Sequence, residues 1–199
     1  MDAIKVIPCL DIQNGRVVKG VHFKDMKDAG DPIECIERYC AEGADEIWLL
    51  DISASTEGRK TNLDMVKAAA AHCTVPLCVG GGIKSLDDAD AVMAAGASKV
   101  GVGSGALHND EVVRRVSYKY GVNATTALVD VFKNAQGEYE VMDAGQNPSG
   151  KQLKPWIRQL EAWGAGEILL TTMQDGARTG YDLEATRIAA QASSLPVIA

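Results

Sequence analysis

Short apolar runs rich in β-branched residues recur along the chain, and longer segments whose apolar positions follow a helical period separate them. The short runs predict strands at residues 4–12, 46–52, 75–79, 99–102, 125–131, 167–171 and 196–199. The segments between them predict amphipathic helices at residues 32–42, 62–72, 86–95, 110–120, 155–163 and 183–192. Continuous apolar strands that alternate with helices are typical of parallel sheets buried on both faces, so the pattern predicts an α/β fold.

The sequence also contains an internal repeat. Residues 42–50 (EGADEIWLL) resemble residues 163–170 (WGAGEILL), and residues 75–77 resemble residues 195–197, about 120 positions further along. Two units of this size would make about 240 residues, close to the roughly 250 of an eight-stranded β/α barrel. We therefore expect one domain over residues 1–199, an incomplete (β/α)8 barrel of TIM type with halves at about 1–120 and 121–199. It should hold about seven strands and lack the last helix, strand and helix.

Composition narrows the possible partners and the compartment. The 199 residues carry a net charge of −7, which provides no basic field for nucleic acid. The longest apolar runs are strand-sized, so we expect no membrane segment. The five cysteines form no CxxC pair and the three histidines do not cluster, so we expect no disulfide framework and no metal site. Together these features predict an enzyme or binding protein of the reducing cytoplasm.

Polar residues that end apolar runs are the first candidates for chemistry, because barrel enzymes place their active sites at the carboxyl ends of the strands. Asp11, Asp51, Asp130 and Thr171 occupy such positions. Any one of them could equally be a helix cap or a solvated loop residue. The repeat places Asp11 and Asp130 on opposite sides of a pseudo-twofold axis. Two carboxylates that face one cavity can divide acid and base roles, so this pair is the catalytic candidate.

Two glycine-rich segments are candidate phosphate loops. Residues 79–85 (VGGGIKS) and residues 101–105 (GVGSG) each follow a predicted strand. Backbone N–H groups in such loops can bind phosphate, although a tight turn would use glycine equally well. Residues 174–180 (QDGARTG) form the corresponding loop of the second half, which predicts part of a second phosphate site.

Four charged residues occupy equivalent early positions in four of the apolar runs: Lys5, Glu46, Lys99 and Glu167. They should meet at the amino ends of the strands, where buried charges have to neutralise one another. The plainer interpretation is a salt-bridged floor for the barrel. The alternative is a gate through which a small neutral molecule passes along the axis.

The chain resembles the cyclase subunit family of imidazole glycerol phosphate synthase, a histidine-pathway β/α barrel. The resemblance runs from end to end and is carried by residues 9–12 (CLDI), 15–20 (GRVVKG), 51–55 (DISAS), 79–83 (VGGGI), 164–170 (GAGEILL) and 180–182 (GYD). It implies that Asp11 and Asp130 are the general acid and base, and that Lys19 lies in a mobile loop over the substrate. The substrate and phosphate set that we expect is Lys19, Gly81, Gly82, Gly103, Ser104, Thr171, Asp175 and Gly176.

The resemblance also implies the reaction. Ammonia would condense with a bis-phosphorylated ribulosyl formimino-aminoimidazole carboxamide ribotide, and cyclisation with cleavage would yield imidazole glycerol phosphate and aminoimidazole carboxamide ribotide. No cofactor is implied. A separate glutaminase subunit docked at the barrel floor would supply the ammonia through the gate of Lys5, Glu46, Lys99 and Glu167. Two positions depart from the family pattern: Gly103 replaces an Asn that binds phosphate, and Ser98 replaces an Asp often used in docking.

Two other functions remain open. One is the related isomerase of the preceding pathway step, which uses a similar two-phosphate barrel; residues 9–12 and 164–170 favour the cyclase. The other is a non-enzymatic barrel fragment that binds phosphosugars or associates with itself through exposed strand edges.

Overall fold

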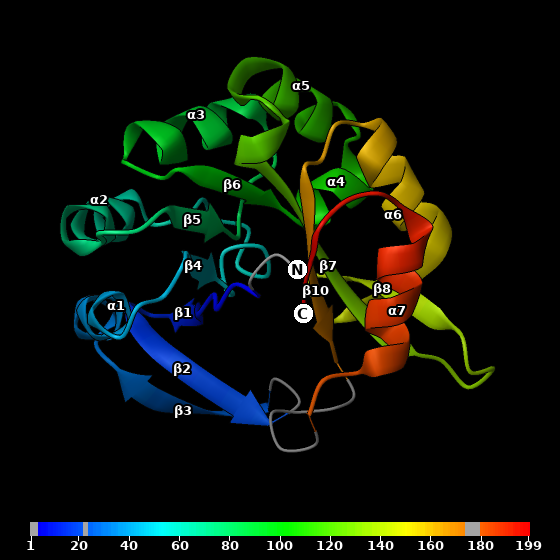
Figure 1. Ribbon diagram of the computed structural model, residues 1–199, viewed down its shortest axis with the longest axis horizontal. Coiled ribbons are helices and arrows are strands. Elements are labelled where there is room, and N and C mark those ends of the chain that lie inside the picture. Colours follow the sequence, from blue (N-terminus) through cyan, green and yellow to red (C-terminus); the bar gives the residue numbers. More distant parts are fainter. Residues whose placement is uncertain (1–3, 22–23, 174–179) are drawn as a thin grey trace.

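Seven parallel strands form the centre of the computed structural model, which describes residues 4–21, 24–173 and 180–199. They are β1 (Cys9–Gln13), β4 (Ile47–Asp51), β5 (Leu77–Gly80), β6 (Lys99–Val102), β7 (Thr125–Lys133), β10 (Glu167–Thr172) and β11 (Val197–Ile198). Their order in the sheet is β11-β10-β7-β6-β5-β4-β1, with every neighbour parallel. All seven match predicted strands, and Figure 1 shows them as an arc with helices around its outside.

The six predicted helices are also present. They are α1 (Pro32–Ala41), α2 (Leu63–His72), α3 (Leu86–Ala94), α5 (Glu111–Tyr120), α6 (Leu153–Ala162) and α7 (Leu183–Ala192). Side chains of Asp31, Asn62, Ser85 and Asp182 accept hydrogen bonds from first-turn N–H groups and so fix where four of these helices begin. Gly43 follows α1 with a φ of 89°, a left-handed conformation that ends the helix and turns the chain toward β4.

Two antiparallel ribbons extend from this sheet and were not predicted. Strands β2 (Arg16–Val21) and β3 (Lys24–Gly30) extend from β1, and β8 (Tyr139–Asp143) and β9 (Asn147–Gln152) extend from β7. Lys19 therefore lies on strand β2, and the expectation that it belongs to a loop was wrong. Both ribbons are rich in polar residues, so they lack the apolar runs that mark the central strands. The short helices α4 (Ser104–His108) and η1 (Val122–Ala124) were also missed.

Apolar side chains pack on both faces of the parallel strands. The larger cluster lies between the sheet and the surrounding helices, with Ile36, Val66 and Ile157 fully buried in it. A smaller cluster, formed only by strand residues and their immediate neighbours, fills the inner face of the arc around Trp48, Cys78 and Leu169. Burial on both faces explains the continuous apolar stretches within these strands, such as residues 47–50 of β4 and 168–170 of β10.

The sheet has two outer parallel strands. Among the described residues β11 pairs only with β10, and β1 pairs with β4 and, through its last residues, with β2. No hydrogen bonds join β1 to β11 in the part of the chain that the structure describes. Figure 1 shows the carboxyl end of the chain near the centre of the arc, beside this opening.

Candidate active site

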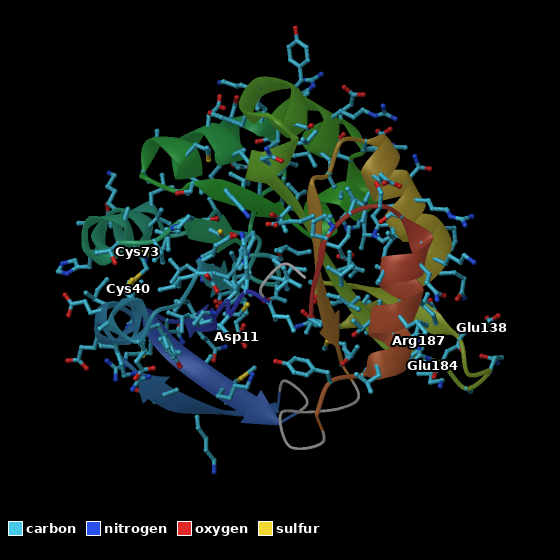
Figure 2. The ribbon with its side chains drawn as sticks, viewed as in Figure 1. Asp11, Cys40, Cys73, Glu138, Glu184 and Arg187 are labelled. Atoms are coloured by element: carbon cyan, nitrogen blue, oxygen red, sulfur yellow. The ribbon has the colours of Figure 1, made fainter. Side chains whose placement is uncertain are left out.

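A cavity of about 720 Å³ opens at the carboxyl ends of the parallel strands. Its size suits a small-molecule ligand. The residues expected from the sequence that line it are Asp11, Lys19, Gly81, Gly82, Gly103, Ser104, Asp130 and Thr171. Figure 2 shows Asp11 on the inner side of the arc. Asp175 and Gly176 lie outside the described residues.

Asp11 and Asp130 approach the cavity from opposite sides, because β4, β5 and β6 separate β1 from β7 in the sheet. Burial raises the pKa of Asp130 to about 6; a hydrogen bond with the Thr171 side chain lowers it and the charge of Asp11 raises it. Burial also raises the pKa of Asp11, and the nearby charge of Lys19 opposes that shift. The two carboxylates therefore sit in different electrostatic environments, as acid and base partners require.

The strand pairing explains the hydrogen bond at Asp130. Thr171 stands directly opposite Asp130 in the parallel register of β10 and β7. Its hydroxyl can donate to the carboxylate without any rearrangement of the backbone. Thr171 thus orients Asp130 at the cavity wall.

The glycine loops after β5 and β6 lie against each other at one end of the cavity. A Cβ on Gly81 would collide with the carbonyl oxygen of Asp51, and a Cβ on Gly105 would collide with that of Ile83. Only glycine permits these close approaches. Ser104 Oγ accepts a hydrogen bond from the Ala144 amide at 2.7 Å, which leaves its O–H as the group that it can donate.

Gly103 differs from its neighbours because a side chain would fit there. A Cβ on Gly103 would lie 3.5 Å from Leu128 Cβ, an ordinary van der Waals contact. The glycine at this position is therefore not required by packing, and it leaves open space at the edge of the cavity.

Arg59 was not singled out from the sequence, although Asp51 was. The Arg59 guanidinium donates to both carboxylate oxygens of Asp51, at 2.5 and 2.8 Å, and to Ser53 Oγ at 2.7 Å. Thr61 Oγ1, two residues further on, donates to the Gly81 carbonyl at 2.5 Å. These contacts fasten residues 52–61 against the first glycine loop. The only sign of this contact in the sequence was an arginine eight positions after a carboxylate that ends a strand. Arg59 reaches Asp51 because the residues between them turn back on themselves.

The four charged residues expected at the amino ends of the strands meet in one cluster, which we call the floor cluster: Lys5, Glu46, Lys99 and Glu167. Lys5 and Lys99 contact Glu46 at 2.7 and 2.6 Å, and Lys99 contacts Glu167 at 3.0 Å. The Glu46 side chain is only 4% exposed. Burial raises its pKa, but hydrogen bonds from Lys5 and Lys99 outweigh burial and hold the pKa below its usual value. The cluster lies at the opposite ends of the strands from the cavity.

The described residues hold no group of three or more His, Cys, Asp or Glu side chains placed to bind a metal ion. Across the same residues, no helix has the length and apolar character that crossing a membrane would need.

The fold is a parallel α/β sheet with two carboxylates near its carboxyl edge. Residues 5–199 match the family model for histidine biosynthesis proteins, and the chain belongs to that family. The chain is 47% identical over 196 residues to the imidazole glycerol phosphate synthase subunit HisF of Acidobacterium capsulatum, which covers 98% of this chain and 78% of that protein. It is 46% identical over 201 residues to the subunit of the same name from Corynebacterium urealyticum, over 99% of this chain and 79% of that protein.

Proposed function

We propose that this chain is a lyase of histidine biosynthesis, the ammonia-dependent cyclase of imidazole glycerol phosphate synthase. Its substrate is the bis-phosphorylated ribulosyl formimino-aminoimidazole carboxamide ribotide. Its products are imidazole glycerol phosphate and aminoimidazole carboxamide ribotide. The observation that carries the proposal is Asp11 and Asp130 facing one cavity from opposite sides in a chain 47% identical to a HisF subunit.

The two carboxylates divide the proton transfers. Ammonia adds to the ribulosyl carbonyl carbon, and that oxygen leaves as water after it accepts protons. Asp130, with a pKa raised to about 6, holds a proton more readily and is the donor. Asp11 lies beside the charge of Lys19, which favours its ionised form, and it removes protons from the added nitrogen. Ring closure onto the formimino carbon and cleavage of its bond to the departing amine complete the reaction.

The glycine loops bind one phosphate of the substrate. Backbone N–H groups of Gly81 and Gly82 and the hydroxyl of Ser104 face the same end of the cavity. Lys19, on the ribbon of β2 and β3, covers the opposite wall. Gly103 contributes backbone only, and Asp175 and Gly176 would hold part of the second phosphate.

The floor cluster is the entry point for ammonia. An apolar layer around Trp48, Cys78 and Leu169 lies on the inner face of the strands between the cluster and the cavity, which suits a neutral molecule better than an ion. A glutaminase subunit docks at this end, where Ser98 is exposed next to Lys99. The five cysteines are free thiols, which fits a cytoplasmic enzyme.

We infer that the arc is a single (β/α)8-type barrel domain with seven strands present. Its two halves, about 1–120 and 121–199, each begin with a strand that carries a catalytic aspartate and continues into an antiparallel ribbon. This duplicated arrangement supports the internal repeat. In a polypeptide of these 199 residues, the unpaired backbone at β11 and at the start of β1 would favour pairing with a second copy of the chain.

The direct test is turnover of the bis-phosphorylated substrate with saturating ammonium salt, which removes any dependence on a glutaminase. We expect the Asp130→Asn variant to lose about 10²- to 10⁴-fold in kcat, the usual effect of removing a general acid or base. Asp64→Asn, a change at an exposed acid on α2, is the matched control and should keep full activity.

Three results would contradict the proposal. They are isomerisation of the preceding pathway substrate in place of cyclisation, no turnover by a chain that gives a cooperative melt, and equal activity in the Asp130→Asn variant. The second result would favour a phosphosugar-binding or assembly protein.

A further inference from the structure

Cys40 and Cys73 lie side by side on the outer surface, away from the cavity. Cys40 is in the last turn of α1, and Cys73 follows the last residue of α2. Their Sγ atoms are 4.0 Å apart. Figure 2 shows the two side chains pointing toward each other between the helices. The separation along the chain is 33 residues, so the fold and not the local sequence brings them together.

The helices hold this pair in place. Packing between α1 and α2 sets the two backbones side by side, and His72 Nδ1 lies 2.7 Å from Glu37 Oε1 across the same junction. Cys73 Sγ donates to the Val75 carbonyl at 3.2 Å, and the Thr74 amide donates to Cys40 Sγ at 3.5 Å. A disulfide requires a sulfur separation of about 2.0 Å, so the two sulfurs must approach by about 2 Å for the bond to form.

The two thiols have different reactivities. Burial raises the pKa of Cys40, but hydrogen bonding, chiefly from Thr74, outweighs burial and places that pKa below its usual value. Burial raises the pKa of Cys73 to about 11. Both side chains are half-buried, so a small oxidant reaches them. Cys40 is thus suited to react with the oxidant first, and Cys73 is suited to react with the oxidised Cys40 sulfur.

We propose that Cys40 and Cys73 form a reversible disulfide when the chain meets hydrogen peroxide, so the α1–α2 junction is a redox-modification site. The Cys40 thiolate attacks one peroxide oxygen; an S–O bond forms, the O–O bond breaks, and hydroxide leaves to become water. Cys73 sulfur then attacks Cys40 sulfur; the S–S bond forms, the S–O bond breaks, and a second water leaves. Peroxide is reduced, both thiols are oxidised, and a dithiol reverses the step.

The test treats the purified full chain with a small excess of hydrogen peroxide. We expect the intact mass to fall by two hydrogen atoms, and a digest without reductant to contain the Cys40 and Cys73 peptides joined. Dithiothreitol should restore the starting mass. The bond closes a long loop, so the melting temperature of the oxidised chain should rise by about 5–10 °C.

Variants locate the bond. Cys40→Ser and Cys73→Ser should each abolish the mass loss, whereas Cys9→Ser, at an exposed cysteine outside the pair, should retain it. Addition of oxygen to Cys40 without a cross-link, or a disulfide that includes Cys9, would overturn the proposal. The peptide map of the oxidised parent chain, which carries no substitution, tests the proposed disulfide even where a variant fails to fold.

Discussion

At the scale of single residues, Asp130 is held in an environment that disfavours its ionised form. Its carboxylate faces the cavity, and burial is the main reason its pKa rises to about 6. A carboxylate loses hydration when it is buried, so the ionised form destabilises the folded chain.

This cost predicts a pH-dependent gain in stability for Asp130→Asn. Between about pH 4 and pH 6 the folded chain binds more protons than the unfolded chain, so the contribution of Asp130 to stability falls as the pH rises. Below about pH 3 both states are protonated and the contribution vanishes. We expect the variant to be more stable by about 2–3 kcal/mol above pH 6, and equal to the parent near pH 3.

Urea unfolding at a series of pH values measures this difference. The matched control is Asp64→Asn, because the Asp64 side chain is almost fully exposed. Its difference from the parent should not change with pH. A constant difference for Asp130→Asn, or a loss of stability above pH 6, would refute the prediction.

At the scale of elements, the floor cluster joins four strand starts that are distant in sequence. Lys99, at the first position of β6, lies between Glu46 before β4 and Glu167 on β10. Thr126 on β7 adds a 2.6 Å hydrogen bond to Glu167. Removing one partner of such a buried pair leaves an uncompensated charge, which costs more than the pair gains.

We therefore expect Lys99→Met to lower the free energy of unfolding by about 2–4 kcal/mol, since Lys5 still neutralises part of the charge on Glu46. Lys119→Met, which breaks a solvent-screened surface pair with Asp90, should cost much less than Lys99→Met. Adding Glu167→Gln to Lys99→Met should recover part of the loss. Equal effects for Lys99→Met and Lys119→Met in urea titrations would contradict a buried network.

The elements also show what the sequence can reveal. The seven parallel strands and six main helices were predicted because burial on both faces, or on one helical face, leaves a strong apolar pattern. The ribbons were missed because segments such as KDMKDAG in β3 and NPSGKQ in β9 are largely solvated. Their pairing depends on register with a neighbouring strand, which no local pattern encodes.

The candidate site was predictable to the same degree. Asp11 and Asp130 lie one residue before the end of the parallel pairing of β1 with β4 and of β7 with β10, and the glycine loops follow β5 and β6. The alternation of strands and helices places these positions together. The contact of Arg59 with Asp51 depends on the path of residues 52–58, and the contact of Cys40 with Cys73 depends on helix packing. Neither the path of a loop nor the packing of two helices leaves a periodic pattern in the sequence.

At the scale of the whole molecule, two outer strand edges lack a neighbour along part or all of their length among the described residues: that of β11 beyond β10, and that of β1 before Ile12, where pairing with β2 begins. Open edges present unpaired N–H and C=O groups that favour pairing with another chain. Apolar side chains lie next to one of these edges: Ile4 is 93% exposed and Val6 is 66% exposed, just before β1. The opening therefore combines unpaired backbone groups with exposed apolar surface, which favours association between copies.

We expect a polypeptide of these 199 residues to associate with itself, so its weight-average mass in sedimentation velocity should rise with protein concentration. Placing charges at the opening, with Ile4→Lys and Val6→Lys together, should shift the distribution toward monomer, because lysine at an edge opposes pairing. Tyr118→Lys removes an equally exposed apolar side chain from α5, on the outer layer of helices, and should leave the distribution unchanged. If the parent sediments as a monomer at every concentration, the open edge is not an interface. If Tyr118→Lys has the larger effect, association occurs through the helical surface.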